Sequence, residues 1–362
     1  MAVRILLVVV LSIFYGCGQS SSPPDQGEQG SGTEPKSVTR SSSGWQEITQ
    51  QRADSATNRP RTSACLGDLR TLSSPRYSPN GQKILVISDV DEYVESRGSA
   101  RSDTIIGSEA DNDICVVNAA GTGMVRLTDD DDAPAEESSA VWSPDGTQLA
   151  FTRVRGAWSS RQSVEPGKVV APRIVIMNVE GSHQRTLPET EVNWHDSRAL
   201  DWSPDGECIA FAGKRGGLYL THADGSGTPR KLMPDPAWRR MEGQSPAWSP
   251  DGKKIAFSRP NGIYVMNTSG EGDTTQWRQL TNSPSGSDYY PAWSPDGTEI
   301  AFTRNSGIYK VDADGSNETR LATGGFPTWS PDRKHIAYDG LGGLYKMNSD
   351  GSAQTLIVDD SP

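Results

Sequence analysis

The sequence is poor in histidine, cysteine and long apolar runs, and each shortage excludes a class of protein. Among 362 residues there are four histidines and four cysteines, with no His-x-x-x-His, Cys-x-x-Cys or Gly-x-Ser-x-Gly motif, so the familiar metal-binding and hydrolase frames are absent. Hydrophobic residues make up only 34%, against 37 glycines and 24 prolines, which disfavours a bundle of long helices. Basic residues are outnumbered, 35 against 46 acidic ones, and the net charge of −11 argues against nucleic acid as a partner.

The longest apolar run lies at the start of the chain and predicts export. Residues 5–15 form an almost unbroken run of eleven apolar residues behind the positive Arg4, which is shorter than the roughly 20 residues that a membrane-spanning helix needs. We therefore expect residues 1–16 to be a signal peptide. The ending Gly16-Cys17 resembles the lipobox of bacterial lipoproteins, which implies a lipid anchor on Cys17. An ordinary signal peptide followed by a chance cysteine is the alternative.

The segment after Cys17 predicts a tether. Residues 18–44 are rich in Ser, Pro, Gly, Glu and Gln and cannot bury enough apolar surface to fold. We expect residues 17–64 to link a membrane surface to a folded domain that spans residues 65–362. Gly18, rather than Asp, follows the cysteine, and by resemblance to Gram-negative lipoproteins this implies the outer membrane. The predicted location is the bacterial envelope, on the periplasmic side of the outer membrane or at the cell surface, with membrane contact through the lipid anchor only.

Beyond the tether, one five-residue phrase returns six times. Each copy opens with an aromatic residue and continues as Ser-Pro-Asp-Gly or a close variant. The aromatic residues are Tyr77, Trp142, Trp202, Trp248, Trp293 and Trp329. The phrase suits a type I turn in a tight hairpin, because proline sets φ at the second position and glycine accepts a positive φ at the fourth. Strand-like runs such as 255–258 and 263–267 follow each phrase, so each repeat predicts four short strands. In the sixth copy Arg333 replaces the glycine, which predicts a strained turn or another turn type.

These motifs resemble the propeller repeat of the TolB family over about residues 71–358. The resemblance implies an all-β fold, a six-bladed β-propeller of four-stranded antiparallel blades with one phrase in each blade. The repeat aromatics are then structural residues packed between blades. For ring closure we expect residues 353–358 to be the outermost strand of the last blade, and residues 69–72 to pair beside it or simply to enter the ring. Cys65 with Cys115 is the one disulfide that we consider.

Length variation predicts which face of the propeller binds a partner. With strands labelled a to d outward from the axis, the a–b and c–d turns are short, whereas the b–c loops at 89–113 and 153–173 and most d–a connections are long. In a meander the b–c and d–a connections leave on the same face, which we call the elaborated face; the a–b and c–d turns form the plain face. Elaborated faces of repeat proteins are typical binding faces, although neutral loop drift would produce the same pattern.

Acidic residues gather on the elaborated face. Asp129, Asp130, Asp131 and Asp132 form an acidic rim, and the loop at 153–173 carries five bases that could neutralise it. A self-compensating solvated surface is the commoner cause of such runs. A basic protein partner is one alternative and Ca²⁺ is another, although the spacing lacks an EF-hand frame. We predict no cofactor.

The start of each innermost strand predicts a recognition site around the axis at the elaborated face. The positions three and four residues before the repeat aromatics include Arg198, Gln244, Tyr289, Tyr290 and Phe326. A cation among aromatic rings is enriched at protein-binding hot spots and also suits stacking on sugars. We therefore expect a protein partner, with a glycan as the alternative, and a monomeric chain. The rival interpretation is that Tyr290 and Phe326 only plug the channel.

Candidate catalytic residues are scarce on this face. Only one histidine, His195, falls in a d–a connection where a ligand could be met. Some pectin-degrading lyases resemble this repeat family and hold a metal with several histidines, so a metal-assisted polysaccharide lyase or hydrolase on the same face is the alternative function. With a single histidine there, we predict a scaffold that is not an enzyme.

Overall fold

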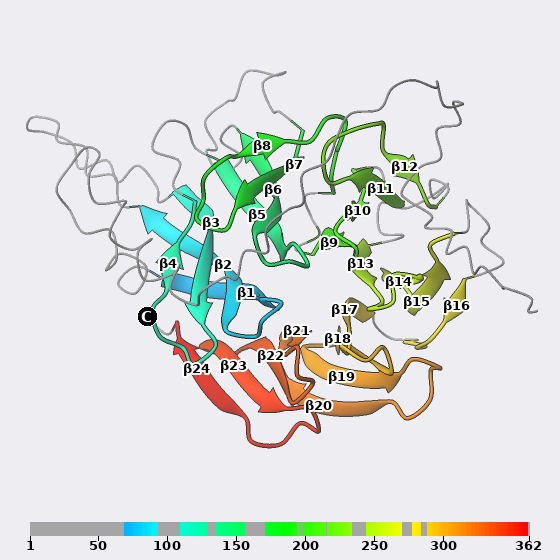
Figure 1. Cartoon of the computed structure of the whole chain (residues 1–362). Helices are drawn as coiled ribbons and strands as arrows, with labels where there is room; N and C mark the ends of the chain where they lie inside the picture. The colour runs from blue at the N-terminus through cyan, green and yellow to red at the C-terminus, as the bar shows by residue number, and fades with distance from the viewer. Residues whose placement is uncertain are drawn as a thin grey trace, which may run out of the picture.

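The propeller accounts for all the residues that the computed structural model describes: 69–92, 109–128, 135–155, 171–193, 196, 198–214, 216–233, 244–269, 277–283 and 288–360. Within these ranges the chain forms six sheets of four strands, and each sheet is an antiparallel meander of consecutive strands. Figure 1 shows the sheets as blades around a central axis, with the first blade in blue beside the last in red. The predicted all-β, six-bladed propeller is thus confirmed. Residues 1–68, Asp129 to Asp132 and His195 lie outside the described ranges.

The strands of the first three blades are as follows: β1 (Leu69–Tyr77), β2 (Lys83–Glu92), β3 (Glu109–Asn118), β4 (Val125–Arg126); β5 (Ala135–Trp142), β6 (Gln148–Arg155), β7 (Arg173–Asn178), β8 (Arg185–Thr186); β9 (Leu200–Trp202), β10 (Cys208–Ala212), β11 (Leu218–His222), β12 (Arg230–Lys231). Those of the last three are β13 (Gln244–Trp248), β14 (Lys254–Arg259), β15 (Gly262–Asn267), β16 (Arg278–Gln279); β17 (Asp288–Trp293), β18 (Glu299–Arg304), β19 (Gly307–Asp312), β20 (Thr319–Thr323); β21 (Gly325–Trp329), β22 (His335–Gly340), β23 (Gly343–Asn348), β24 (Thr355–Asp359). None of the described residues forms a helix that could cross a membrane.

The repeated phrase forms the same hydrogen-bonded a–b turn in every blade. In the fourth blade the Ser249 hydroxyl donates to Asp251 Oδ1 at 2.6 Å, and the amide of Gly252 donates to the Ser249 carbonyl at 2.9 Å. In the other five blades the corresponding serine donates to the third residue of the turn, four times Asp and once Asn80, at 2.5–2.8 Å. These bonds stay within a few residues, which is why the phrase alone predicts the turn.

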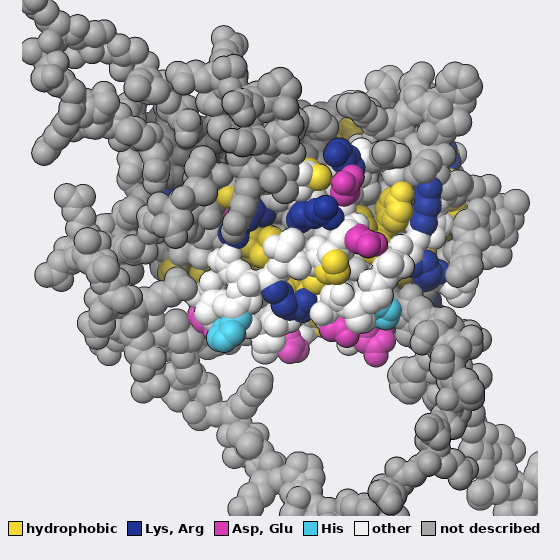
Figure 2. All heavy atoms as spheres, turned by 90° about the horizontal axis from the view of Figure 1, so that it is seen from above, with side chains coloured by type: hydrophobic (Ala, Val, Ile, Leu, Met, Phe, Trp, Pro, Cys, Tyr) yellow, Lys and Arg dark blue, Asp and Glu magenta, His cyan; other side chains and the backbone are white. Residues whose placement is uncertain are grey.

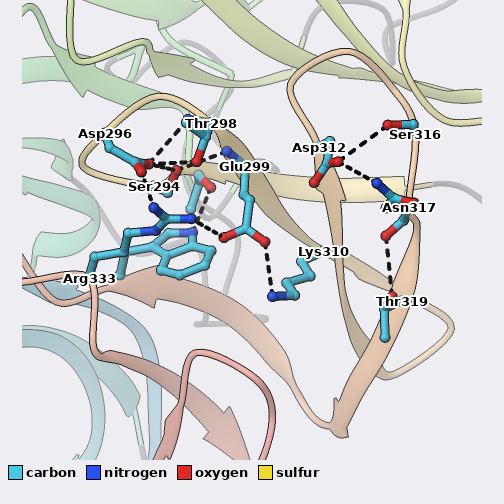
Figure 3. A network of polar contacts seen from close by, with 12 residues as sticks. Ser294, Asp296, Thr298, Glu299, Lys310, Asp312, Ser316, Asn317, Thr319 and Arg333 are labelled. Atoms are coloured by element: carbon cyan, nitrogen blue, oxygen red, sulfur yellow. Dashed lines mark hydrogen bonds and ion pairs between the residues drawn. The ribbon is translucent and has the colours of Figure 1, made fainter.

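The sixth turn keeps this geometry despite Arg333. The amide of Arg333 donates to the Ser330 carbonyl at 2.9 Å, as the glycines do, and its φ is 62°. The prediction of strain is confirmed and the alternative of another turn type is wrong. The side chain reaches the preceding blade, where its guanidinium pairs with Asp296 and, at 2.9 Å, with Glu299 (Figure 3). Glu299 also pairs with Lys310 at 2.9 Å.

Among the described residues, apolar side chains form six core clusters, and each cluster lies between two neighbouring blades. Each cluster contains, or packs against, the repeat aromatic of one of its two blades; Trp202 and Trp329, for example, are 7% and 6% exposed. Three indoles also donate across a blade boundary at 3.1 Å, Trp142 to the Arg76 carbonyl, Trp293 to that of Ala247 and Trp329 to that of Ala292. The predicted packing of the aromatics between blades is confirmed.

The ring closes without exchanging strands between blades. β24 pairs with β23, so the C-terminal segment is the outermost strand of the last blade, as predicted. Residues 69–72 belong to β1, the innermost strand of the first blade, which pairs with β2; their pairing beside β24 is wrong. The two ends meet through the Leu72 amide, which donates to Asp360 Oδ2 at 2.8 Å, and through a cluster that joins Leu72 to Leu344 and Val358.

The lengths of the connections differ between the two faces. On the plain face all six a–b turns have five residues, and the c–d turns have six or seven except for ten at 268–277. On the elaborated face the b–c connections range from two residues to seventeen, and the d–a connections from one to thirteen. The meander topology places these two classes together, as the sequence predicts.

Candidate functional site

The innermost strands share a β-bulge that shapes the axis. Five of them have a positive φ of 51–58° three residues before the repeat aromatic and a register shift beside it. The residues with positive φ are Ser74, Ser139, Ser245, Tyr290 and Phe326. A bulge re-aims the side chains of a strand, and here bulged residues of neighbouring blades contact one another, as in the Tyr290–Phe326 stack. The third blade is the exception, because β9 begins only at Leu200.

Arg198 crosses the axis in place of that missing bulge. Its side chain is 1% exposed, and its guanidinium donates to the carbonyls of Pro327 at 2.7 Å, Pro75 at 2.9 Å and Phe326 at 2.6 Å. These acceptors belong to the sixth and first blades, so Arg198 ties the third blade to the opposite side of the ring. Burial lowers the pKa of Arg198, and the charge of Arg76 acts in the same direction.

Asp196 completes this cross-link beside Arg198. Its Oδ2 accepts from the Ser245 amide at 2.5 Å, and its Oδ1 accepts from the Ser245 hydroxyl at 2.9 Å and the Arg198 amide at 3.0 Å. Its carbonyl accepts from the Ser139 hydroxyl at 2.8 Å. Burial raises the pKa of this carboxyl, and the bonds from Arg198 and Ser245 oppose that shift. Asp196 and Arg198 together therefore contact five of the six blades, counting their own.

Aromatic rings close the axis near its elaborated end. Tyr290 stacks on Phe326 with ring centroids 4.1 Å apart, Tyr289 lies 5.8 Å from Tyr290, and the guanidinium of Arg198 lies 5.6 Å from the Phe326 ring. This arrangement supports the rival interpretation, in which Tyr290 and Phe326 plug the channel. Tyr290 and Phe326 are half-buried, as are Tyr289 and Gln244.

The burial of Arg198 differs from the surface position that the sequence predicts. An arginine in a loop between blades is normally solvated, but this one has three carbonyl acceptors from strands that are distant in sequence. Its role in binding a partner stays a prediction, as do those of Gln244, Tyr289, Tyr290 and Phe326. The structure gives Arg198 a structural role across the axis.

The sequence did not predict a pair of neighbouring carboxyl groups, Asp339 and Asp360, at the seam between the last and first blades. Burial and the nearby Asp360 raise the pKa of Asp339 to about 7, against the opposing charge of Arg198. Asp339 in β22 occupies the position that Thr303 occupies in β18. The only signal in the sequence is that this polar residue differs between the two repeats. Its neighbour Asp360 accepts the Leu72 amide that closes the ring.

The described cysteines overturn one prediction. Cys115 takes no part in a disulfide and is buried in the cluster between the first and last blades, so a bridge from Cys65 to Cys115 is wrong. Cys208 is the described cysteine that is disulfide-bonded. Cys208 is buried, with 4% of its surface exposed.

The described surface is mixed in charge. In Figure 2 basic and acidic side chains are interspersed on the side of the ring seen there. Among the described residues no three His, Cys, Asp or Glu side chains are grouped closely enough to hold a metal ion. Of the described histidines, His183 in the second blade is exposed, whereas His222 in the third blade and His335 in the sixth are half-buried.

Comparisons with known proteins agree with this architecture. The family model of the TolB β-propeller domain matches residues 237–359. TolB from Acinetobacter baumannii is 17% identical with a TM-score of 0.54, covering 76% of this chain and 63% of that one. The tricorn protease is 14% identical with a TM-score of 0.55, covering 81% and 27%. A chain of a nidogen/laminin complex is 11% identical with a TM-score of 0.51, covering 79% and 92%. No curated protein matches the chain in sequence.

The closed ring of six meanders defines the chain as a β-propeller. Residues 237–359 match the model of the TolB β-propeller domain, and the fold is similar to that of A. baumannii TolB. It spans less than two thirds of the A. baumannii TolB chain and about a quarter of the tricorn protease chain. At such identities the likeness concerns the fold.

Proposed function

We propose that this chain is a non-catalytic β-propeller, anchored in the bacterial envelope, that binds a protein partner on its elaborated face. The contrast between the two faces carries the proposal. The plain face repeats the same five-residue turn in every blade, while the elaborated face has connections that range from one to seventeen residues. Loops of variable length on a rigid scaffold are where repeat proteins build specific contacts.

The contact surface proposed lies around the closed mouth rather than inside the channel. Arg198 and the Tyr290–Phe326 stack occupy the axis, so a partner would meet the half-buried Gln244 and Tyr289 beside them. Aromatic side chains fixed by neighbouring rings lose little entropy on binding, which favours them as anchors.

The proposed location rests on the N-terminal pattern. The apolar run of residues 5–15, the ending Gly16-Cys17 and the polar tract after it are those of a lipid-anchored exported protein. A Cys17→Ser variant should lose labelling by palmitate and its association with membranes. Unchanged labelling would remove the anchor from the proposal.

Partner binding is tested by capture from envelope extracts with cross-linking. A Gln244→Ala, Tyr289→Ala variant should lose the captured protein while its thermal unfolding stays near that of the wild type. Lys334→Ala is the matched control, because this side chain is 74% exposed on the plain face and should not affect capture. Capture that survives the mouth variant but is lost on deleting Asp129 to Asp132 would move the site to the acidic rim and contradict the proposal.

A further inference from the structure

A cavity opens at the opposite end of the axis, on the plain face. It has a volume of ≈ 270 Å³ and lies between the first, second, third and sixth blades. Four aromatic residues and one ion pair dominate its lining: Tyr77, Trp142, Trp202, Trp329, Arg76 and Asp201. None of these residues has a place in the partner surface proposed above.

The rim of the cavity is rigid. Prolines of the repeated phrase line it, and each lies against the glycine of the next turn; a β-carbon added to Gly81 would stand 3.3 Å from Pro331 Cδ, and one on Gly146 would stand 3.7 Å from Pro79 Cδ. Proline fixes its own backbone, and every turn is held by the serine bonds described above. The cavity is therefore preformed, which reduces the entropic cost of binding.

The aromatic walls present carbon to the cavity. The indole N–H groups are already used, since Trp142 donates to the Arg76 carbonyl at 3.1 Å, Trp202 to the Gly206 carbonyl at 3.0 Å and Trp329 to the Ala292 carbonyl at 3.1 Å. The walls can thus pack against C–H groups but offer few donors. The charged side chains that line the cavity are Arg76 and Asp201.

Arg76 is loosely engaged with the protein, whereas Asp201 Oδ2 accepts from the Trp248 amide at 2.7 Å and Oδ1 is the oxygen that faces Arg76. Arg76 Nη1 lies 3.8 Å from Asp201 Oδ1, and Arg76 Nη2 lies 3.5 Å from the Leu200 carbonyl. Both distances exceed the 2.7–3.2 Å of an ordinary N–H···O bond, while a guanidinium has five N–H donors. The side chains are 13% and 20% exposed, so a ligand in the cavity can reach both.

The charges of the pair select the kind of ligand. A carboxylate or phosphate would be attracted to Arg76 but repelled by Asp201. An amine would be attracted to Asp201 but repelled by Arg76, and either charge would lose its solvation in this site. A neutral group that accepts from Arg76 and donates to Asp201 meets neither cost. Two adjacent hydroxyls on a ring have this property, and the ring carbons would lie against the indoles.

The shape of the cavity favours a ring over a chain. Its volume is just below the range of about 300–1,000 Å³ that is typical of small-ligand sites, and Arg198 closes the axis further along. A peptide is bound in extended form by a groove or a strand edge, and the cavity is instead surrounded by four blades. We propose that the plain-face cavity binds the terminal ring of a neutral sugar end-on, with two adjacent hydroxyls between Arg76 and Asp201.

The test uses the full chain and a panel of neutral methyl glycosides, read by tryptophan fluorescence and by saturation-transfer NMR. At least one glycoside should bind, and Arg76→Lys and Asp201→Asn should each weaken it by at least about tenfold. Asp201→Asn keeps the size of the side chain, so it is the variant expected to fold normally. Arg278→Lys, at an exposed position on the outer strand β16, is the control and should leave binding unchanged.

Several outcomes would overturn the proposal. They are the absence of binding by every glycoside, binding that both cavity variants leave intact, and preference for a uronate or an acetylated dipeptide amide over neutral glycosides. Because the Gln244→Ala, Tyr289→Ala variant alters only the opposite face, it should bind the glycoside normally. Failure of the partner proposal and failure of this one are therefore distinguishable.

Discussion

At the scale of single residues, the places where one repeat departs from the others are the most informative. Arg333 occupies a left-handed position that glycine fills in five other turns, yet it keeps the turn and reaches Asp296 and Glu299 of the neighbouring blade. An L residue at positive φ costs about 1–2 kcal/mol, and exposed ion pairs return about 0–1 kcal/mol. The cost of the left-handed backbone at Arg333 is therefore close to the gain from its ion pairs.

Substitution of Arg333 should separate the two effects. Arg333→Ala keeps the strained backbone and loses the ion pairs, so it should be the least stable form. Arg333→Gly loses the same ion pairs but relieves the strain, and should exceed Arg333→Ala by about 1 kcal/mol. Urea denaturation midpoints measure the difference. Equal midpoints for the two variants would show that the left-handed conformation carries no cost in this turn.

The repeat tryptophans should differ in a predictable way. Trp293 donates to the Ala247 carbonyl across a blade boundary, whereas the buried Nε1 of Trp248 has no partner among the described residues. Trp293→Phe leaves the Ala247 carbonyl without its donor, whereas Trp248→Phe removes a donor that has no acceptor. Trp293→Phe should therefore lower the free energy of unfolding by about 1 kcal/mol more than Trp248→Phe. Trp248→Ala should cost about 3–5 kcal/mol through the cavity it leaves. Chemical denaturation of the three variants checks this order, and a reversed order of the two phenylalanine variants would contradict it.

At the scale of elements, each blade is a meander of four consecutive strands, and the two ends of the described propeller meet at the seam between the first and last blades. That seam depends on a cluster of apolar side chains and on the bond from the Leu72 amide to Asp360. Two carboxyl groups, Asp339 and Asp360, lie near one another there, and the pKa of Asp339 is raised to about 7. We therefore expect the stability of the seam to depend on pH.

The sign of this dependence follows from the direction of the shift. The folded chain holds the Asp339 proton more tightly than the unfolded chain, where an aspartate has a pKa of about 3.9. Its contribution to stability is complete below pH of about 4 and is lost as the pH rises through about 7. Asp339→Asn should remove this loss and be about 1–2 kcal/mol more stable than wild type at pH 8, after allowance for partial solvent screening.

Thermal unfolding from pH 5 to pH 8 measures the effect. The control is Asp314→Asn, because Asp314 is an exposed carboxyl in a c–d turn whose pKa is lowered by the hydroxyl and amide of Ser316. It should keep the wild-type slope over this range. A slope that persists in Asp339→Asn would assign the pH dependence to another group.

At the scale of the whole molecule, two sets of contacts hold the ring together. Apolar clusters join neighbouring blades, and Asp196 and Arg198 join blades across the axis. The clusters join neighbours only. Arg198 joins opposite sides, donating from the third blade to carbonyls of the first and sixth. The contacts across the axis therefore help to hold the propeller together.

Removing the guanidinium should destabilise the whole ring. Arg198→Met keeps much of the side-chain volume but leaves the carbonyls of Pro75, Phe326 and Pro327 without their donor, which should cost at least about 3 kcal/mol. Arg320→Met, at an exposed strand position, should change stability by less than about 0.5 kcal/mol. Guanidinium denaturation compares them. An Arg198→Met midpoint equal to that of wild type would show that the axis does not hold the ring together.

The sequence by itself determined the parts of this protein that rest on local and repeated contacts. Six copies of one phrase give six blades, because each turn is closed by bonds between residues at most five apart, such as Ser249 with Asp251 and Lys254. The aromatic residue that opens the phrase packs against the preceding blade every time, so its packing could also be predicted. The tertiary structure alone decided what lies on the axis. Arg198 and Phe326 are 128 residues apart, and Arg76 and Asp201 belong to different blades; such neighbours depend on how the ring closes, and the pattern within one repeat holds no information about them. Burial, the raised pKa of Asp339 and the plain-face cavity all follow from that closure.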